Sequence, residues 1–111
     1  MSNSDITTIT SALIEFRNER DWEQFHNPKD LALAINVEAG ELLEQFLWKE
    51  ATAGNPEKVK EELADVFAFA FLLAEKYGWD VKEIVLDKIS KNAAKYPVEK
   101  AKGTAKKYDE L

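Results

Sequence analysis

Two asparagine–proline pairs constrain the fold of this chain most strongly, because each carries the start signal of a helix. Asn27-Pro28 and Asn55-Pro56 place a capping side chain directly before a proline at the first helical position. The helix that starts at Pro28 is predicted to run to about Glu50. The helix that starts at Pro56 is predicted to end at Gly78, which is typical of a C-terminal cap.

Two further helices complete the prediction. Residues 5–20 carry apolar side chains at helical spacing, and an aromatic-rich connector, residues 21–26, follows them. Asp80 and Glu83 resemble a capping box and start a fourth helix that ends near Pro97, before a basic tail. No strand pattern competes with these segments. We therefore expect an all-α fold of the four-helix-bundle type, in a single domain of residues 1–111.

Apolar residues indicate that the bundle is oligomeric. The segment 63–74 is apolar on nearly every side of its helix, whereas a surface helix of a monomer keeps one polar face. We expect this helix to be buried within the bundle and against another subunit. The predicted buried face of the fourth helix is formed by Val81, Ile84, Val85 and Ile89.

Composition and charge exclude several classes of function. The net charge of −6 argues against a protein that binds nucleic-acid backbones, although a nucleotide held through a metal ion remains compatible with it. The chain has no cysteine, which excludes a thiolate metal site and a cysteine nucleophile. No apolar stretch is long enough to span a membrane, and residues 1–10 lack a signal pattern. We expect a cytoplasmic protein.

Two acidic doublets are the main candidate for a functional site. Glu38 and Glu41 lie in the second predicted helix, and Glu62 and Asp65 lie in the third. The spacing i, i+3 projects both carboxylates of a doublet from one face of its helix. Two neighbouring antiparallel helices can therefore converge four carboxylates on one point. Carboxylate oxygens are preferred ligands of Mg²⁺, so the pattern predicts a magnesium site.

The alternative is that these side chains are ordinary surface acids, as most Glu and Asp residues are. Three of the four have no Lys or Arg at i±3 or i±4, and only Glu62 has a lysine there. Asp65 stands among residues typical of a core, where an unpaired carboxylate costs several kcal/mol. Gly40 costs about 1 kcal/mol within a helix and indicates a close approach to the backbone. These features favour the metal site; Glu44 and Glu61 are further candidates that also fit an exposed face.

The doublets belong to a longer set of motifs that resembles a known family. Glu38-x-x-Glu41 followed by Glu62-x-x-Asp65 resembles the signature of the all-α nucleoside triphosphate pyrophosphohydrolases, the MazG-like superfamily. Further segments extend the resemblance over nearly the whole chain: Phe16, residues 19–26, Pro28, Leu31, Trp48-Lys49, Lys88, Asn92, residues 96–98 and residues 103–111. Together they are similar to the dCTP pyrophosphatase branch.

The resemblance implies an activity and an assembly. It implies a bundle that dimerises and pairs again into a tetramer, with Mg²⁺ held by the four doublet carboxylates. The implied reaction cleaves a nucleoside triphosphate between its α and β phosphates, with one of these carboxylates, left unassigned, as general base. Lys88, Asn92 and Tyr96 match positions that contact the phosphates or the sugar.

The resemblance also implies a pocket for a pyrimidine base. Trp22 and Trp48 match aromatic positions that hold the base, and His26 matches a nearby position. Stacking on an aromatic ring contributes about 1–3 kcal/mol per base. A tryptophan without such a match is more often a core residue, and Trp79 is expected to be that ordinary case.

Two positions depart from the vertebrate-type relatives. Leu13 and Phe69 stand where those relatives carry His and Tyr, so the predicted pocket, which includes Phe69, lacks two polar contacts that bear on cytosine selectivity. The expected substrate is dCTP or a related pyrimidine nucleotide; dUTP or a broad set of nucleoside triphosphates is the alternative. A helical oligomer that binds nucleotides without turnover is a third reading. It would need a defective metal set, and all four acids are present.

Overall fold

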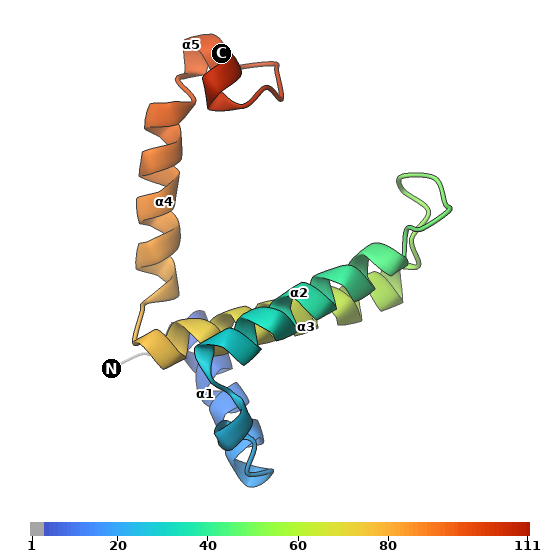
Figure 1. Ribbon diagram of the computed structural model, residues 1–111, viewed down its shortest axis with the longest axis vertical. Coiled ribbons are helices and arrows are strands. Elements are labelled where there is room, and N and C mark those ends of the chain that lie inside the picture. The colour runs from blue at the N-terminus through green and yellow to red at the C-terminus, as the bar shows by residue number, and fades with distance from the viewer. Residues whose placement is uncertain (1–3) are drawn as a thin grey trace. The chain divides into compact units, whose positions relative to one another are not determined.

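The computed structural model describes residues 4–111, and every secondary-structure element in that range is helical (Figure 1). The elements are α1 (Asp5–Glu19), η1 (Glu23–Phe25), α2 (Pro28–Glu44), α3 (Pro56–Tyr77), α4 (Val81–Lys95), α5 (Val98–Ala101) and η2 (Tyr108–Glu110), where η denotes a short 3-10 helix. The all-α prediction is confirmed for this range. Residues 1–3 of the polar N-terminal segment lie outside the described residues.

Capping residues determine where the helices begin and end, as the sequence predicts. The side-chain oxygen of Asn27 accepts a hydrogen bond of 2.9 Å from the backbone N–H of Asp30, and Asn55 and Asp80 cap α3 and α4 in the same way. Such a cap stabilises a helix by about 1 kcal/mol. Gly78 closes α3 at φ 70°, in the left-handed region that glycine adopts without strain.

The second helix is shorter than predicted. It ends at Glu44, not near Glu50, because the next backbone N–H groups bond to carbonyls three residues back and Trp48 lies at φ 61°. No proline or glycine marks this end in the sequence. Gly54 then closes the connection against the ring of Phe46, where a Cβ atom would come within 2.7 Å of a ring carbon.

The chain divides into two compact units, Met1–Gly78 and Trp79–Leu111. In the first unit α2 and α3 run antiparallel side by side, and α1 packs against α3 (Figure 1). The buried apolar residues of this unit are Leu31, Leu72 and Ala74. The pairing of α2 with α3 is the feature that positions the acidic residues, since each helix carries one doublet.

Several side chains predicted to be buried are exposed in the described chain. Ile84, Val85 and Ile89 of α4 are 40%, 50% and 57% exposed, because their own unit contains only α5 and η2 besides α4. Trp79, predicted to be an ordinary core residue, is 52% exposed. Phe67 on the apolar part of α3 is also 52% exposed. The four-helix bundle itself stays a prediction.

Among residues 4–111, no helix has both the length and the apolar character needed to cross a membrane.

Candidate active site

Three of the four predicted metal ligands form one cluster between α2 and α3. Carboxylate oxygens of Glu38, Glu41 and Glu62 lie within 4.8 Å of one another. The spacing i, i+3 puts Glu38 and Glu41 on one side of α2, and the antiparallel neighbour α3 brings Glu62 opposite them. Oxygens that lie this close can share a bound cation. Neither Glu44 nor Glu61 is part of the cluster.

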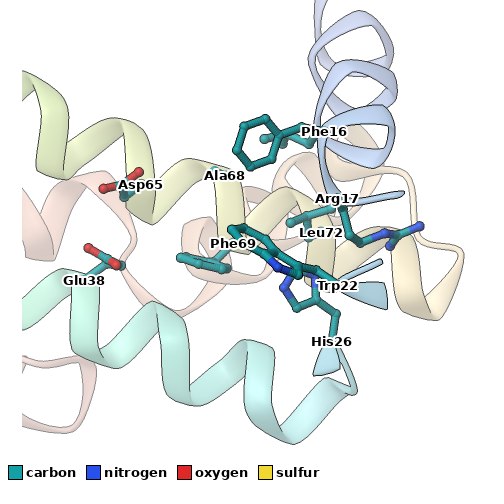
Figure 2. A pocket seen from close by; sticks show the side chains of 10 residues that line it. Phe16, Arg17, Trp22, His26, Glu38, Asp65, Ala68, Phe69 and Leu72 are labelled. Atoms are coloured by element: carbon teal, nitrogen blue, oxygen red, sulfur yellow. The ribbon is translucent and has the colours of Figure 1, made fainter. Parts of the chain in front are cut away.

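Asp65, the fourth predicted ligand, lies beside the cluster. It follows Glu62 on α3, and Figure 2 shows Asp65 and Glu38 on the two neighbouring helices, both lining the cavity described below. Its side chain is exposed, so the expectation that Asp65 is buried in the core is wrong for this chain. The apolar neighbours of Asp65 along the sequence lie on other faces of α3. A Cβ atom at Gly40 would meet no atom within 4 Å, so the described chain makes no close approach there.

Burial, together with the crowding of these acids, raises the pKa of two of them. Burial, then the adjoining Glu41 carboxylate and the charges of Asp65 and Glu62, raise the pKa of Glu38 to about 7. Burial, then Glu41 and Asp65, also raise the pKa of Glu62. Within residues 4–111, none of the four acids forms an ion pair with a Lys or Arg side chain.

The donor set fits a hard divalent cation. The Oε2 atoms of Glu38 and Glu62 are shielded from solvent and have no hydrogen-bond partner in the described chain. Ordinary surface acids keep their oxygens in contact with water, so this shielding argues against a solvated acidic face. A cation of the Mg²⁺ type would coordinate the unpartnered oxygens and offset the mutual repulsion of the carboxylates.

A cavity of about 360 Å³ adjoins the acidic cluster (Figure 2). It is lined by Leu13, Phe16, Arg17, Trp22, His26, Glu38, Asp65, Ala68, Phe69 and Leu72. Glu38 and Asp65 form its acidic end, and apolar and aromatic side chains form most of the remainder. Its volume is in the range of small-molecule pockets, roughly 300 to 1,000 Å³. Three of the predicted base-pocket residues, Trp22, His26 and Phe69, therefore share one space with two of the predicted metal ligands.

The end of α1 directs Trp22 to the cavity. Asp21 lies in the left-handed region at φ 55°, and the N–H groups of Asp21 and Trp22 donate to the carbonyl oxygens of Asn18 and Arg17, at 3.1 and 3.0 Å. This pair of bonds is a Schellman motif, with an aspartate in place of the usual glycine. The motif folds the Trp22 ring back onto Phe16, with the ring centroids 5.8 Å apart and the rings edge to face.

His26 places a polar atom in the cavity wall. Its Nδ1 atom is buried and has no hydrogen-bond partner in the described chain. Its ring meets the ring of Phe69 edge to face at 6.3 Å. Burial, then the charges of Arg17 and Lys76, lower the pKa of His26, so the imidazole is neutral at pH 7. A neutral imidazole can donate at one nitrogen and accept at the other.

Four predicted substrate-binding residues do not line this cavity. Trp48 lies in the connection between α2 and α3 and is fully exposed. Lys88, Asn92 and Tyr96 belong to the second unit, where Lys88 and Asn92 are exposed on α4 and Tyr96 is its C-cap. The spacing i, i+4 puts Lys88 and Asn92 on one face of α4. Their roles stay predictions.

Phe16 and Arg17 line the cavity although the sequence did not assign them to the site. A phenylalanine at helical spacing is typical of the core-facing side of a helix, and an arginine near a helix end is typical of a solvent-exposed position. Neither residue type at these positions indicates a binding site. The signal that could have indicated them is Asp21, because a left-handed turn at that position folds the chain back over the last turn of α1.

The all-helical fold and the acidic site agree with the family to which the sequence can be assigned. The MazG-like family model matches residues 33–111, and the chain belongs to the MazG-like family. The matched range contains both acidic doublets and α4.

Individual relatives are also similar. dCTP pyrophosphatase 1 of Mus musculus is 41% identical over 105 residues, and that of Homo sapiens is 40% identical; each alignment covers 87% of this chain and 62% of the relative. The chain therefore spans less than two thirds of the length of these relatives. The crystal structure of a pyrophosphatase from Archaeoglobus fulgidus is similar at a TM-score of 0.80 and 33% identity, covering 87% of this chain and 96% of that one.

Proposed function

We propose that this chain is a Mg²⁺-dependent nucleoside triphosphate pyrophosphohydrolase that converts dCTP, or a related pyrimidine nucleotide, to the monophosphate and pyrophosphate. The observation that carries the proposal is the cluster of Glu38, Glu41 and Glu62, in which Glu38 and Glu62 each have a shielded oxygen and Glu38 lines an aromatic cavity. The relatives named dCTP pyrophosphatase 1 and the similar pyrophosphatase structure support the same chemistry.

The carboxylates would perform two tasks in this reaction. Glu38, Glu41 and Glu62, with Asp65 beside them, would hold Mg²⁺ and position the triphosphate. Bound Mg²⁺ supplies the positive charge that the phosphate oxygens require in the transition state. One of the four carboxylates accepts a proton from the attacking water. The water oxygen bonds to the α-phosphorus, the bond from that phosphorus to the oxygen bridging to the β-phosphate breaks, and pyrophosphate leaves.

The cavity would hold the base. Trp22 and Phe69 offer aromatic surfaces on which a pyrimidine can stack, and His26 offers an unpartnered ring nitrogen to the polar edge of the base. Leu13 and Phe69 contribute no polar group. Because stacking tolerates every base, selectivity for cytosine over uracil rests on few hydrogen bonds. We propose Trp48 as a further stacking residue.

The remaining contacts belong to the second unit and to the assembly. We propose that Lys88, Asn92 and Tyr96 contact the triphosphate and the sugar, and that the chain acts as one catalytic domain in a homodimer or homotetramer. A role in housekeeping of the nucleotide pool follows from the substrate class. The cytoplasmic location stays a prediction.

The test is pyrophosphate release by the purified chain from the eight ordinary NTPs and dNTPs, in Mg²⁺ and in EDTA. The proposal expects release only with Mg²⁺ and the highest kcat/KM with dCTP. Activity on all eight nucleotides would keep the chemistry and reject the pyrimidine preference. Inactivity of the folded chain on all eight nucleotides would reject dCTP as the substrate in favour of a modified nucleotide or of binding without turnover.

A matched pair of variants assigns the activity to the cluster. Glu38→Gln removes one ligand charge and is expected to lower kcat/KM at least 100-fold, because metal and water positioning depend on it. Glu44→Gln makes the same change on the same helix outside the cluster and is expected to retain activity. Equal activity of the two variants would reject the assignment of Glu38.

A further inference from the structure

Arg17 is a buried charge that the proposed chemistry does not use. Its exposed fraction is 4%, and among the described residues it is the one charged residue that is buried. Its side chain lines the cavity, and Figure 2 shows it extending away from Glu38 and Asp65. A buried guanidinium is costly unless its donors are satisfied, so the partners of Arg17 indicate what it holds in place.

The partners of Arg17 lie on separate elements. Its Nη1 atom lies 3.4 Å from Oε2 of Glu75 on α3, and its Nη2 atom lies 3.7 Å from Oε2 of Glu23 in η1. Its Nε atom donates to Oδ1 of Asn18 at 3.2 Å. Lys76 on α3 binds the other oxygen of Glu23 at 3.5 Å. Glu23 is therefore held by one cation from α1 and one from α3.

Glu23 belongs to the short segment that carries two cavity residues. Trp22 directly precedes η1, and His26 directly follows it. The carbonyl oxygen of Glu23 accepts a hydrogen bond of 3.0 Å from the N–H of His26. An anchor at Glu23 therefore restrains the backbone between the two residues that face the cavity.

We propose that Arg17 is a positioning residue for the base pocket: through Glu23 it fastens the connector of residues 21–26 to α3 and so fixes Trp22 and His26 in the cavity wall. Arg17 acts through these residues and not on the phosphates. The inference rests on the proposed function for the identity of the bound base, whereas the anchoring itself is independent of it.

His26 supplies a direct readout, because it is the single histidine of the chain. The two charged residues that act on it, Arg17 and Lys76, both pair with Glu23, and the acidic residues Glu38 and Asp65 line the same cavity. Burial is the largest cause of its lowered pKa, followed by Arg17 and Lys76. Release of the connector would expose the ring and return its pKa toward 6.5.

The experiment measures the His26 titration by NMR in the untagged, metal-free full chain and in the variant Glu23→Gln. Loss of the negative charge of Glu23, taken alone, lowers the pKa of a nearby histidine or leaves it unchanged. Loss of the anchor raises it. We expect the second result, as a threefold or larger gain in the proton affinity of His26. Glu19→Gln, an exposed acid that pairs with Arg20, is the matched control and is expected to leave the titration unchanged.

Variants of Arg17 change both the anchor and a charge that itself lowers the pKa of His26. Arg17→Met is therefore expected to raise the pKa of His26 for both reasons, and Arg17→Lys, which keeps the charge without the guanidinium geometry, to restore part of the wild-type value. Arg17 is buried, so its variants can fail to fold. In that case the titration of His26 in Glu23→Gln decides, because the Glu23 side chain is exposed. A lowered or unchanged pKa in Glu23→Gln would overturn the proposal.

A kinetic measurement then connects the anchor to the substrate. In Glu23→Gln, KM for dCTP is expected to rise about fivefold or more while kcat and Mg²⁺ affinity stay unchanged, because a displaced Trp22 weakens base stacking and leaves the cluster intact. An unchanged KM, or a fall in kcat alone, would overturn the proposal. Absence of turnover in the wild type would reject the proposed function and leave the NMR result to decide the anchoring.

Discussion

At the scale of single residues, the acidic cluster is held together against its own repulsion. Glu38, Glu41 and Glu62 approach within 4.8 Å, and two of their oxygens are shielded from solvent. The fold imposes this approach because the doublets sit on paired antiparallel helices. Without a cation the charged form of Glu38 destabilises the folded chain, and this cost has a specific dependence on pH.

The variant Glu38→Gln is expected to change how stability depends on pH. The pKa of Glu38 is about 7 in the folded chain and ordinarily 4.5, so between these values the folded chain retains a proton that the unfolded chain has lost. In EDTA the wild type should therefore lose stability relative to Glu38→Gln as the pH rises from 4.5 to 7, with no further loss above it. Thermal unfolding of both proteins from pH 4.5 to 8 measures this difference. Parallel curves would contradict the raised pKa, and Glu44→Gln, the control, should parallel the wild type.

Trp48 is expected to affect substrate binding and not stability. Its side chain is fully exposed, so it contributes no packing within the described chain. Trp48→Ala should shift the melting temperature by no more than about 2 °C while KM for the preferred nucleotide rises about fivefold or more and kcat changes little. Leu47→Ala in the same connection is the control. Equal KM values for the two variants would remove Trp48 from the proposed pocket.

At the scale of residues, the sequence predicted the acidic cluster but mispredicted the exposure of Asp65 and missed Arg17. The i, i+3 spacing was sufficient to predict the clustering of Glu38, Glu41 and Glu62, because helix geometry and one helix pairing determine it. The exposure of Asp65 was mispredicted, since the character of neighbours along the chain does not report which face of a helix a side chain occupies. Arg17 was missed because Glu75 is brought to it only by tertiary packing and Glu23 only by the turn at Asp21.

At the scale of elements, local capping chemistry explains most of the fold. The caps at Asn27, Asn55, Gly78 and Asp80 lie where the sequence predicted them, because each depends on one or two neighbouring residues. The end of α2 was mispredicted, because the turns after Glu44 depend on the whole connection up to α3. The sequence predicted the connector of residues 21–26 as a segment but not its turn.

That turn yields a prediction at Asp21. A β-branched residue is strained in the left-handed region by about 1–2 kcal/mol, whereas glycine adopts it freely. Asp21→Val should therefore lower the melting temperature by several degrees and raise KM, because Trp22 is displaced. Asp21→Gly should retain wild-type KM. If both variants had the wild-type KM and melting temperature, the Schellman motif would have no part in orienting Trp22.

A second prediction concerns the glycines at and near the connection between α2 and α3. A methyl group at Gly54 would come within 2.7 Å of the Phe46 ring, so Gly54→Ala should lower the free energy of unfolding by about 1 kcal/mol or more. Gly40→Ala, where a Cβ atom meets no atom of the chain within 4 Å, is the matched control and should raise it by about 1 kcal/mol. Denaturant unfolding measures both. Equal stability of Gly54→Ala and wild type would show that the ring shifts without cost.

At the scale of the whole molecule, the described chain buries little apolar surface. Its buried apolar residues are Leu31, Leu72 and Ala74, while Phe67, Ile84 and Ile89 are among the exposed large ones. Composition predicted the apolar character of α3 and α4 but not what covers them, since a sequence does not distinguish burial within a subunit from burial between subunits. Chains of this size often complete a core by oligomerisation, which supports the proposed assembly.

The apolar face of α4 tests the assembly. If a second copy covers this face, Ile89→Lys places an uncompensated charge in the interface and should shift the protein toward the 12.6 kDa monomer in size-exclusion chromatography with light scattering. The melting temperature of the wild type should increase with protein concentration, whereas that of the Ile89→Lys variant should not. Ser90→Lys introduces the same side chain at the adjacent exposed position and should keep the wild-type mass. A monomeric wild type would refute the oligomer, and equal dissociation of both variants would move the interface away from Ile89.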